Sequence, residues 1–217
     1  MSRELLRLSD ISHIADPFDP TNVDQIVYPS EATEAYLKRW ASRATATRNL
    51  VIYGPPGTGK TRASILLAKQ RCAEFLDEDP IRYVECESGT FDELLQIQKN
   101  ESTVFGRAAC SSFESVVILD EVDNYIPPQQ KQLKKVMERA DQCYILLTNH
   151  ITKLDSGLRN RCYEIPWFVP TFEACVPRLQ EISFKLLNKS LDQDTLRSRV
   201  YTTSGWRQML RNLDALA

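Results

Sequence analysis

The sequence lacks the cysteine spacing of a zinc module or a disulfide framework. Its six cysteines are scattered along 217 residues, and none forms a C-x-x-C pair. This distribution favours a reducing compartment. Long hydrophobic runs are missing as well: the amino terminus does not read as a signal peptide, and no apolar stretch approaches the length that crosses a membrane. We therefore expect a protein that is not secreted and has no membrane partner, located in the cytoplasm, the nucleus or, for a viral protein, the host cytoplasm.

The chain also lacks a strong excess of charge of either sign. Its formal net charge is −2 at pH 7, which gives no global attraction to nucleic acid, so DNA binding would need a local basic patch. Hydrophobic residues make up 42% and charged residues 26% of the chain, as in ordinary soluble globular proteins. The length fits one large or two small domains.

Glycine is scarce, and its distribution is uneven. Three of the seven glycines fall in the stretch GPPGTGKT, which fits the phosphate-binding P-loop pattern G-x-x-x-x-G-K-[ST]. An apolar run at 50–53 before it reads as a buried strand, and residues 61–69 after it read as a helix. In such a loop, backbone N–H groups and the helix N-terminus bind phosphate oxygens. The predicted nucleotide-binding residues are Gly54, Pro55, Pro56, Gly57, Thr58, Gly59, Lys60 and Thr61.

Charged and hydroxyl side chains supply more of the predicted site. Lys60 would reach the β- and γ-phosphates of the nucleotide, and the Thr61 hydroxyl would bind Mg²⁺. Asp120 ends the most apolar strand of the chain, 116–120, and an acid at that position can hold the same Mg²⁺. The adjacent Glu121 is placed to orient or deprotonate an attacking water. The alternative for this acidic pair is a surface cap on the following turn.

A polar residue follows the next apolar strand. Asn149 comes directly after 143–148, where its side-chain amide would also position water. The alternative is an ordinary turn residue, which is the commoner role of a lone Asn after a strand.

The order of the apolar segments predicts the fold class. Five runs are expected to be strands: 50–53, 81–86, 116–120, 143–148 and 162–165. Helical patterns separate them, and this alternation predicts an α/β fold with a parallel five-stranded sheet sandwiched by helices. Ser30 is expected to cap one of these helices, and another is expected to run from Pro127 through Ala140. From about residue 171 the pattern is helical only, so we expect a nucleotide-binding domain at 1–168 and a small helical lid at 169–217.

Taken together, the motifs resemble those of the AAA+ ATPases. They are the P-loop, the segments 119–123 (LDEVD), 133–138 (LKKVME), 158–162 (LRNRC) and 204–207 (SGWR), and the pair Thr148-Asn149. Within this family they are most similar to the small subunits of clamp loaders, of the replication factor C and phage types. The likeness runs from about residue 18 to the C-terminus.

The resemblance implies a role for each motif residue. Asp120 would be the Walker B metal ligand, Glu121 the catalytic glutamate and Asn149 the sensor 1 residue. Arg161 would be an arginine finger that reaches the nucleotide of a neighbouring subunit, and Arg207 the sensor 2 residue of the lid. A fixed cation of this kind neutralises charge on the transferred phosphoryl group. The alternative for Arg161 is one member of a solvated arginine pair beside a strand.

The sequence also departs from the family pattern. Asn160 and Trp206 replace Ser and Met, and Gly205 stands where an acid is expected. Tyr28 stands where a Gly is usual in the segment beside the adenine, which bears on the selectivity for ATP. Clamp-loader subunits continue into a helical collar, and the sequence ending at Ala217 leaves no room for one. The resemblance then implies that this chain alone assembles weakly.

A basic face is predicted on the helix that begins near residue 127. Lys131, Lys135 and Arg139 recur at i, i+4 and i+8, whereas apolar residues occupy a different face. In a spiral of subunits this stripe would follow a DNA phosphate backbone. The alternative is an ordinary solvated helix face.

These observations lead to one functional hypothesis and two rivals. The hypothesis is an ATP-hydrolysing, Mg²⁺-dependent module of clamp-loader type that acts in DNA replication within an oligomer. Its partners would be other AAA+ subunits, DNA and a sliding clamp. The rivals are another AAA+ DNA remodeller, such as a helicase loader, and an ATP-switched DNA-binding or scaffold protein with negligible turnover.

Overall fold

The computed structural model describes residues 18–74, 80–87, 89–92, 94–95, 115–138 and 142–216. Its centre is a sheet of five parallel strands in the order β2-β3-β4-β1-β5. The strands are β1 (Leu50–Tyr53), β2 (Ile81–Glu85), β3 (Ser115–Asp120), β4 (Gln142–Thr148) and β5 (Tyr163–Pro166). Each strand begins and ends within one residue of its expected position, so the predicted parallel sheet is confirmed.

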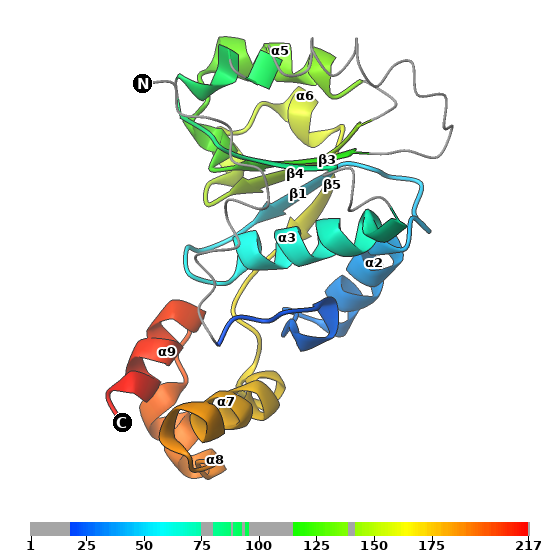
Figure 1. The fold of residues 1–217 in the computed structure, drawn as a ribbon. Helices are drawn as coiled ribbons and strands as arrows, with labels where there is room; N and C mark the ends of the chain where they lie inside the picture. The colour runs from blue at the N-terminus through cyan, green and yellow to red at the C-terminus, as the bar shows by residue number, and fades with distance from the viewer. Residues whose placement is uncertain are drawn as a thin grey trace.

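Helices cover both faces of the sheet. They are α2 (Glu31–Ala41), α3 (Lys60–Arg71), α5 (Pro127–Val136) and α6 (Ser156–Arg159), with the short 3-10 turns η2 (Val23–Gln25), η5 (Val122–Asn124) and η6 (Ile151–Lys153). In Figure 1, α5 and α6 lie on one face of the sheet and α2 and α3 on the other. This arrangement is the predicted α/β sandwich.

The carboxyl-terminal helices lie apart from the sheet. They are α7 (Phe172–Leu187), α8 (Gln193–Thr195), the π-helical turn η7 (Leu196–Val200) and α9 (Trp206–Asp214). In Figure 1 they form a separate group beyond α2 and α3, and their buried side chains make a hydrophobic cluster of their own. The division into domains after residue 168 stays a prediction. Among the helices of the described residues, none is long and apolar enough to cross a membrane.

The central strands are apolar on both sides because helices cover both sides. All seven residues of β4 are buried, and such continuous apolar runs are typical of parallel sheets. Successive side chains of a strand point to opposite faces. In β1, Leu50 and Ile52 therefore join the core shared with α2 and α3, whereas Val51 joins the core shared with α5.

The amino end of α2 is capped as the sequence predicts. The Ser30 Oγ accepts a hydrogen bond from the backbone N–H of Thr33 at 3.2 Å. Glu31 and Glu34 lie in the first turn, where negative charge interacts favourably with the helix dipole. Near the other end of the helix, Trp40 is buried in the core against the sheet.

The helix that follows the acidic segment 119–123 is shorter than predicted. The expectation that it runs through Ala140 is wrong, because α5 ends at Val136 and Met137 is its C-cap. The N–H of Met137 still bonds to the carbonyl of Leu133 at 2.9 Å, which closes the last turn. The chain has to turn there because β4 begins only a few residues later, at Gln142.

The loop between β1 and α3 lies directly against the segment that follows β5. The backbone N–H of Trp167 donates to the carbonyl of Tyr53 at 2.7 Å, and its indole Nε1 donates to the carbonyl of Thr58 at 3.0 Å. Trp167 is 1% exposed, so this contact lies in the interior. A Cβ atom on Gly54 would lie 2.0 Å from the carbonyl oxygen of Trp167. Glycine is therefore required at this position.

Gly54→Ala should destabilise the fold. The added methyl group meets backbone, which cannot rotate away as a flexible side chain would. We expect a loss of about 3 kcal/mol in the free energy of unfolding, the upper end of the usual cost of overpacking, measured by urea denaturation. Gly89→Ala is the matched control, because among the described residues no atom outside its chain neighbours lies within 4 Å of a Cβ at Gly89. Equal unfolding free energies for Gly54→Ala and the wild type would contradict the close contact.

Candidate active site

Groups from four parts of the fold converge at the carboxyl edge of the sheet. There the P-loop, the ends of β3 and β4 and the start of α9 line an open cavity of about 480 Å³. The predicted site residues among its lining are Pro56, Gly57, Thr58, Gly59, Lys60, Thr61, Asp120, Glu121, Asn149 and Arg207. Of the predicted site, Gly54, Pro55 and Arg161 do not line this cavity.

Two glycines let the P-loop turn into the cavity. Gly57 has a φ of +75° and Gly59 a φ of +88°, a left-handed backbone conformation that strains residues with a side chain. Gly59 is also the N-cap of α3, and the first turn of that helix contains no acidic residue. The positive end of α3 is therefore not neutralised by an acid of its own and suits an anion.

Lys60 is held at the loop by neutral oxygens. The residue is 8% exposed. Its Nζ donates to the carbonyls of Gly54 at 2.8 Å and Pro55 at 2.7 Å, and to Oδ1 of Asn149 at 2.9 Å. Burial lowers the pKa of Lys60, and the negative charge of Asp120 only partly offsets this shift. Phosphate oxygens in place of these neutral acceptors would carry the opposite charge and so make stronger hydrogen bonds with the ammonium group.

The Asp120 carboxylate receives three hydrogen bonds. Its Oδ2 accepts one from the Thr61 hydroxyl at 2.7 Å and one from the Tyr83 hydroxyl at 2.9 Å. Its Oδ1 accepts one from the backbone N–H of Glu121 at 2.9 Å. Burial and the nearby charge of Asp120 raise the pKa of Tyr83, so this phenol stays a donor.

The donor set around Asp120 fits Mg²⁺. A hydroxyl oxygen from Thr61 and a carboxylate oxygen from Asp120 lie 2.7 Å apart at the cavity wall. Mg²⁺ prefers such oxygen ligands, is usually bound by one or two carboxylates, and completes its shell with phosphates and water. The open cavity beside the two residues leaves room for those further ligands.

Glu121 is held in a strained backbone conformation at the cavity. Its φ of 53° and ψ of 41° are left-handed, which costs roughly 1–2 kcal/mol for a residue with a side chain. Its Oε2 accepts a hydrogen bond from Nδ2 of Asn124 at 3.2 Å, and the same nitrogen donates to the carbonyl of Cys86 at 3.1 Å. A strained, exposed carboxylate beside a metal-type donor set is a candidate general base.

Asn149 lies on a turn that is anchored to the loop after β3. The Thr148 hydroxyl donates to Oδ1 of Asp123 at 2.6 Å and accepts from the backbone N–H of His150 at 2.9 Å. The side chain of Asp123 is only 7% exposed. These bonds fix the turn that carries Asn149, whose side-chain oxygen accepts from Lys60. Asn149 is therefore tied to the P-loop rather than left in solvent.

The start of α9 packs backbone against backbone on the P-loop. The N–H of Arg207 donates to the carbonyl of Gly57 at 3.3 Å. A Cβ on Gly205 would lie 2.6 Å from that same oxygen, and Gly205 has a φ of +112°. This contact explains a glycine at the position where an acid was expected. It also brings Trp206 and Arg207 to the cavity wall.

Arg161 lies away from the cavity, on the turn between α6 and β5. Its guanidinium donates to Oε1 of Glu138 at 2.6 Å and to the carbonyl of Gly157 at 2.9 Å, and 38% of its side chain is exposed. Arg159 instead pairs with both carboxylate oxygens of Glu164, at 2.8 and 3.0 Å. The two arginines are not a freely solvated pair, because each has an acidic partner on this chain.

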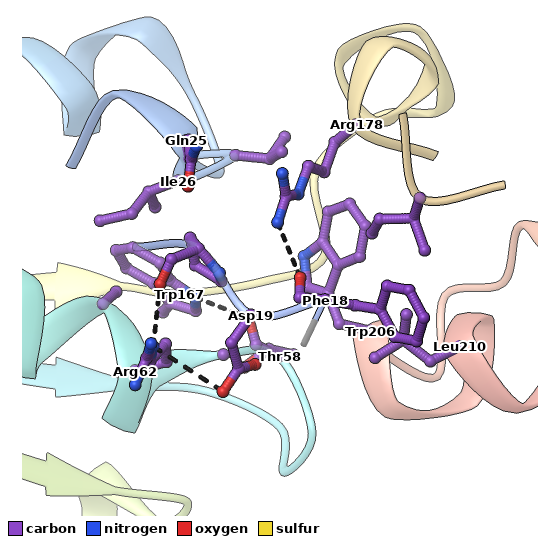
Figure 2. Close-up of a pocket in the computed structure, with 15 residues that line it drawn as sticks. Phe18, Asp19, Gln25, Ile26, Thr58, Arg62, Trp167, Arg178, Trp206 and Leu210 are labelled. Carbon is purple, nitrogen blue, oxygen red and sulfur yellow. Dashed lines mark hydrogen bonds and ion pairs between the residues drawn. The ribbon is translucent and has the colours of Figure 1, made fainter. Parts of the chain in front are cut away.

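A second, smaller cavity of about 90 Å³ opens beside the P-loop. Figure 2 shows it between the lead-in segment, α3 and the start of α9. Its apolar and aromatic lining residues include Ile26, Val27, Trp167, Trp206 and Leu210. The two cavities share six lining residues: Asp19, Thr58, Gly59, Arg62, Trp206 and Leu210. An apolar slot that adjoins a phosphate-type site suits a flat aromatic ring.

Tyr28 does not line the second cavity. Its ring packs edge-on against Trp167 with the centroids 6.0 Å apart, and its hydroxyl donates to the carbonyl of Val23 at 3.1 Å. Burial raises the pKa of Tyr28 to about 12. A glycine was expected at this position. The tyrosine ring that stands there packs against Trp167, which lines the cavity, and does not itself fill the cavity.

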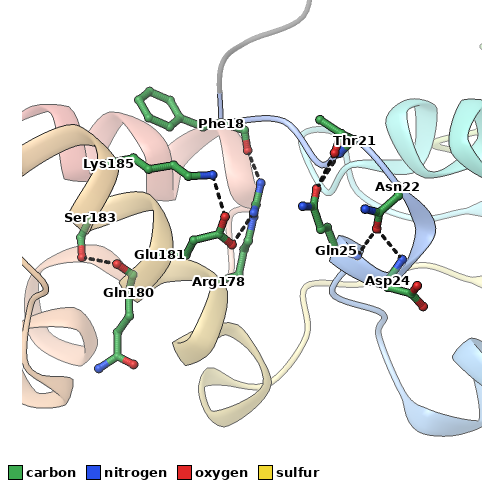
Figure 3. Close-up of polar contacts among 10 residues, drawn as sticks. All are labelled: Phe18, Thr21, Asn22, Asp24, Gln25, Arg178, Gln180, Glu181, Ser183 and Lys185. Carbon is green, nitrogen blue, oxygen red and sulfur yellow. Dashed lines mark hydrogen bonds and ion pairs between the residues drawn. The ribbon is translucent and has the colours of Figure 1, made fainter.

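Polar contacts hold the lead-in segment between α3 and α7. In Figure 3 the buried Arg178 of α7 donates to the carbonyl of Phe18 at 2.7 Å and pairs with Glu181 at 2.5 Å. On the other side, Arg62 of α3 donates to the carbonyl of Pro20 at 3.0 Å. The segment that closes the second cavity is thus fastened to both helices.

The structure describes part of the predicted basic face. Lys131 and Lys135 are exposed on α5, whereas Leu133 is fully buried. Lys134 pairs with Asp155 at 3.0 Å and does not belong to the exposed pair. The third predicted member, Arg139, lies outside the described residues. Two cations one helical turn apart therefore share an exposed face.

Sequence reasoning missed two residues that order the site. The sequence did contain an indication for Asp123, because this residue belongs to the same acidic motif as Asp120 and Glu121. The sequence contained no such indication for Tyr83, which looks like an ordinary strand residue. Its contact with Asp120 depends on how β2 and β3 are aligned. Strand alignment is set by packing and is not written in either segment alone.

Comparisons with known proteins agree with this geometry. The model of the ATPase family associated with various cellular activities (AAA) matches residues 50–169. Replication factor C small subunit 1 of Pyrobaculum arsenaticum is 30% identical in an alignment of 153 positions that covers 68% of this chain and 44% of that protein. Replication factor C subunit 5 of Mus musculus is 29% identical in an alignment of 180 positions that covers 77% of this chain and 49% of that protein.

A solved structure has the same fold. The Thermotoga maritima RuvB Holliday junction branch migration motor matches with a TM-score of 0.64 at 16% identity, over 91% of this chain and 64% of that chain. At this identity the likeness shows the fold alone. The chain spans about half the length of the two sequence relatives, 44% and 49%.

Proposed function

This chain belongs to the AAA family of ATPases, and from that premise we propose that it binds ATP together with Mg²⁺ and hydrolyses it. The observation that carries the proposal is the shared cavity at the sheet edge, where the P-loop meets Asp120, Glu121, Asn149 and Arg207. Each of these groups has the charge or polarity that phosphoryl transfer to water requires.

Positive groups bind the phosphates. Lys60 exchanges its carbonyl acceptors for β- and γ-phosphate oxygens, and the N-terminus of α3 adds backbone N–H donors. Arg207 contributes a further cation from the start of α9, beside Gly57 of the P-loop. These fixed donors favour the charge distribution of the transition state because they need no reorganisation during the reaction.

Thr61 and Asp120 would hold Mg²⁺ through their side-chain oxygens, which lie 2.7 Å apart. When bound, the metal ion neutralises charge that develops on the phosphoryl oxygens. Glu121 accepts a proton from the attacking water, and Asn149 helps to position that water beside the γ-phosphate. Both side chains belong to residues of the cavity lining.

The adenine ring occupies the second cavity. Its apolar wall comes from Ile26 and Val27 of the lead-in segment and from Trp206 and Leu210 of α9. Because this cavity adjoins the P-loop, one nucleotide can fill both spaces with its ring in the apolar slot and its phosphates at the loop. The contacts of Arg178 and Arg62 with the lead-in segment keep this wall in place.

Arg161 serves the nucleotide of a neighbouring subunit. Two features support this role: its residue does not line the cavity of its own chain, and its partly exposed side chain lies on the turn before the edge strand β5. A neighbouring subunit that docks at this edge would receive the guanidinium at its phosphates. The ion pair with Glu138 is exposed enough that breaking it costs little.

The biological role that we propose is clamp loading in DNA replication, within an oligomer of AAA+ subunits that acts on DNA and a sliding clamp. The names of the two replication factor C relatives support it. The sheet domain at 1–168 would bind the nucleotide, and the helices at 169–217 would act as its lid.

Steady-state ATP hydrolysis with and without primed DNA and a sliding clamp tests the role. Stimulation by both ligands is the expected result. Stimulation by DNA alone would point to a different DNA remodeller, and binding of ATP without turnover would point to a nucleotide-switched scaffold.

Lys60→Ala should abolish ATP binding, whereas Glu121→Gln should bind ATP but hydrolyse it slowly. The first change removes the main cationic partner of the phosphates, and the second removes only the general base, an effect of about 10²–10⁴ in rate. Nucleotide titration and phosphate release measure the two properties. Glu173→Gln, an exposed change on α7, is the control. Wild-type hydrolysis by Glu121→Gln would refute the role of this carboxylate.

Arg161→Ala should leave the affinity for ATP nearly intact and lower turnover by about 10³–10⁵, the usual contribution of an arginine finger. An exposed charge with a purely structural role is worth about 1 kcal/mol or less. Arg159→Ala is the matched control, because it removes a neighbouring ion-paired arginine. Turnover should also rise with protein concentration, since the complete site needs two subunits.

Mixing distinguishes a shared site from a site within one chain. The Arg161→Ala protein has an intact P-loop, and the Lys60→Ala protein still has Arg161. When the two inactive proteins are mixed, we therefore expect part of the ATPase activity to return. No recovery at any ratio, with turnover independent of concentration, would rule out the shared site.

Replacing Lys131 and Lys135 by Ala should weaken DNA binding and reduce its salt dependence. Each lost phosphate contact lowers the slope of log K against log [salt] by about 1, so we expect a decrease of about 2 for each subunit that contacts DNA. Lys185→Ala with Lys189→Ala removes the same charge from the last turn of α7 and the segment just after it, and serves as the control. An unchanged slope would make this helix face an ordinary solvated surface.

A further inference from the structure

Tyr83 bonds to a residue of the cavity lining but does not line the cavity itself. It lies in the middle of β2, in register with Ile118 of β3. Residues two positions apart on a strand share a face, so Asp120 lies on the same side of the sheet as Ile118. The hydroxyl of Tyr83 donates to Oδ2 of Asp120 at 2.9 Å, although Tyr83 does not line the cavity itself.

The ring of Tyr83 is held by the sheet and its core. It packs, partly buried, against the hydrophobic cluster that contains Ile118 and Leu67. The hydroxyl therefore meets Asp120 from a rigid element and not from a loop. A hydrogen-bond donor that is carried by a strand keeps its position when the loops around the cavity move.

Building on the ATPase function proposed above, we propose that Tyr83 is a positioning residue for Mg²⁺. Its hydroxyl holds Oδ2 of Asp120 and so fixes the orientation in which the carboxylate meets the metal ion. The other donor to Oδ2 is Thr61, which is itself a proposed ligand, and the N–H of Glu121 bonds to the opposite oxygen. Of these two donors to Oδ2, Tyr83 is the one that does not line the cavity.

This role predicts an effect confined to the metal-dependent part of nucleotide binding. Hydrogen-bond partners of metal ligands typically change metal affinity by about 10- to 100-fold when removed. Tyr83→Phe deletes only the hydroxyl and keeps the ring that packs on the core. The P-loop donors, which bind the phosphates, are untouched by this change.

The experiment compares the Kd of a fluorescent ATP analogue in EDTA with its Kd in saturating Mg²⁺. The ratio of the two values measures the coupling between metal and nucleotide. Tyr144→Phe is the matched control. It also removes a hydrogen bond from a tyrosine hydroxyl inside the sheet, here to Gln142, and Tyr144 does not line the cavity. Circular dichroism checks that both variants are folded.

We expect Tyr83→Phe to keep the wild-type Kd in EDTA and to weaken the Kd in Mg²⁺ by about 10- to 100-fold. Tyr144→Phe should leave both values unchanged. An unchanged ratio for Tyr83→Phe, or equal weakening in EDTA and Mg²⁺, would overturn the proposal.

A double-mutant cycle tests whether Tyr83 acts through Asp120. In an Asp120→Asn background, Tyr83→Phe should cause no further loss of the Mg²⁺ effect, because the carboxylate it orients is gone. A second loss of the same size would overturn the proposal. If the wild type itself binds no analogue in either condition, the ATPase function fails as well, which separates that outcome from a failure of Tyr83 alone.

Discussion

The carboxylate of Asp120 is the point on which the arrangement of the site depends. Its three hydrogen bonds come from α3, from β2 and from the turn that follows β3. The bond from Thr61 ties the first turn of α3 to the sheet, and the same turn carries Lys60. The distance between the P-loop and the acid proposed to bind Mg²⁺ is therefore set by packed helices and strands, which hold functional groups more rigidly than loops do.

The sheet was predictable because helices on both of its faces make its strands apolar throughout. β1, β3 and β4 each appear in the sequence as an uninterrupted apolar run, and the structure places them at the centre. The end of α5 was not predictable in the same way. Apolar residues continue at helical spacing from Leu133 through Met137 to Ala140, past the point where the chain turns toward β4. Periodicity reports which side is buried but not where the backbone changes direction.

Residues of the candidate site were predicted when a local motif contained them, and missed when the contact joined distant segments. The P-loop and the pair Asp120-Glu121 are recognisable by type and spacing. The bonds from Tyr83 to Asp120, from Thr148 to Asp123 and from Arg178 to Phe18 instead join residues 37, 25 and 160 positions apart. They depend on strand register and on how α7 packs, and neither is encoded in a short stretch of sequence.

The contact between α9 and the P-loop has a mechanical consequence. The carbonyl of Gly57 accepts the N–H of Arg207 and touches the backbone of Gly205. A peptide group is planar and turns as a unit, so this carbonyl and the N–H of Thr58 rotate together. Any rotation that swings that N–H toward or away from a phosphate also swings the oxygen beneath α9. One peptide plane would then couple an anion bound at the P-loop to the position of the carboxyl-terminal helix.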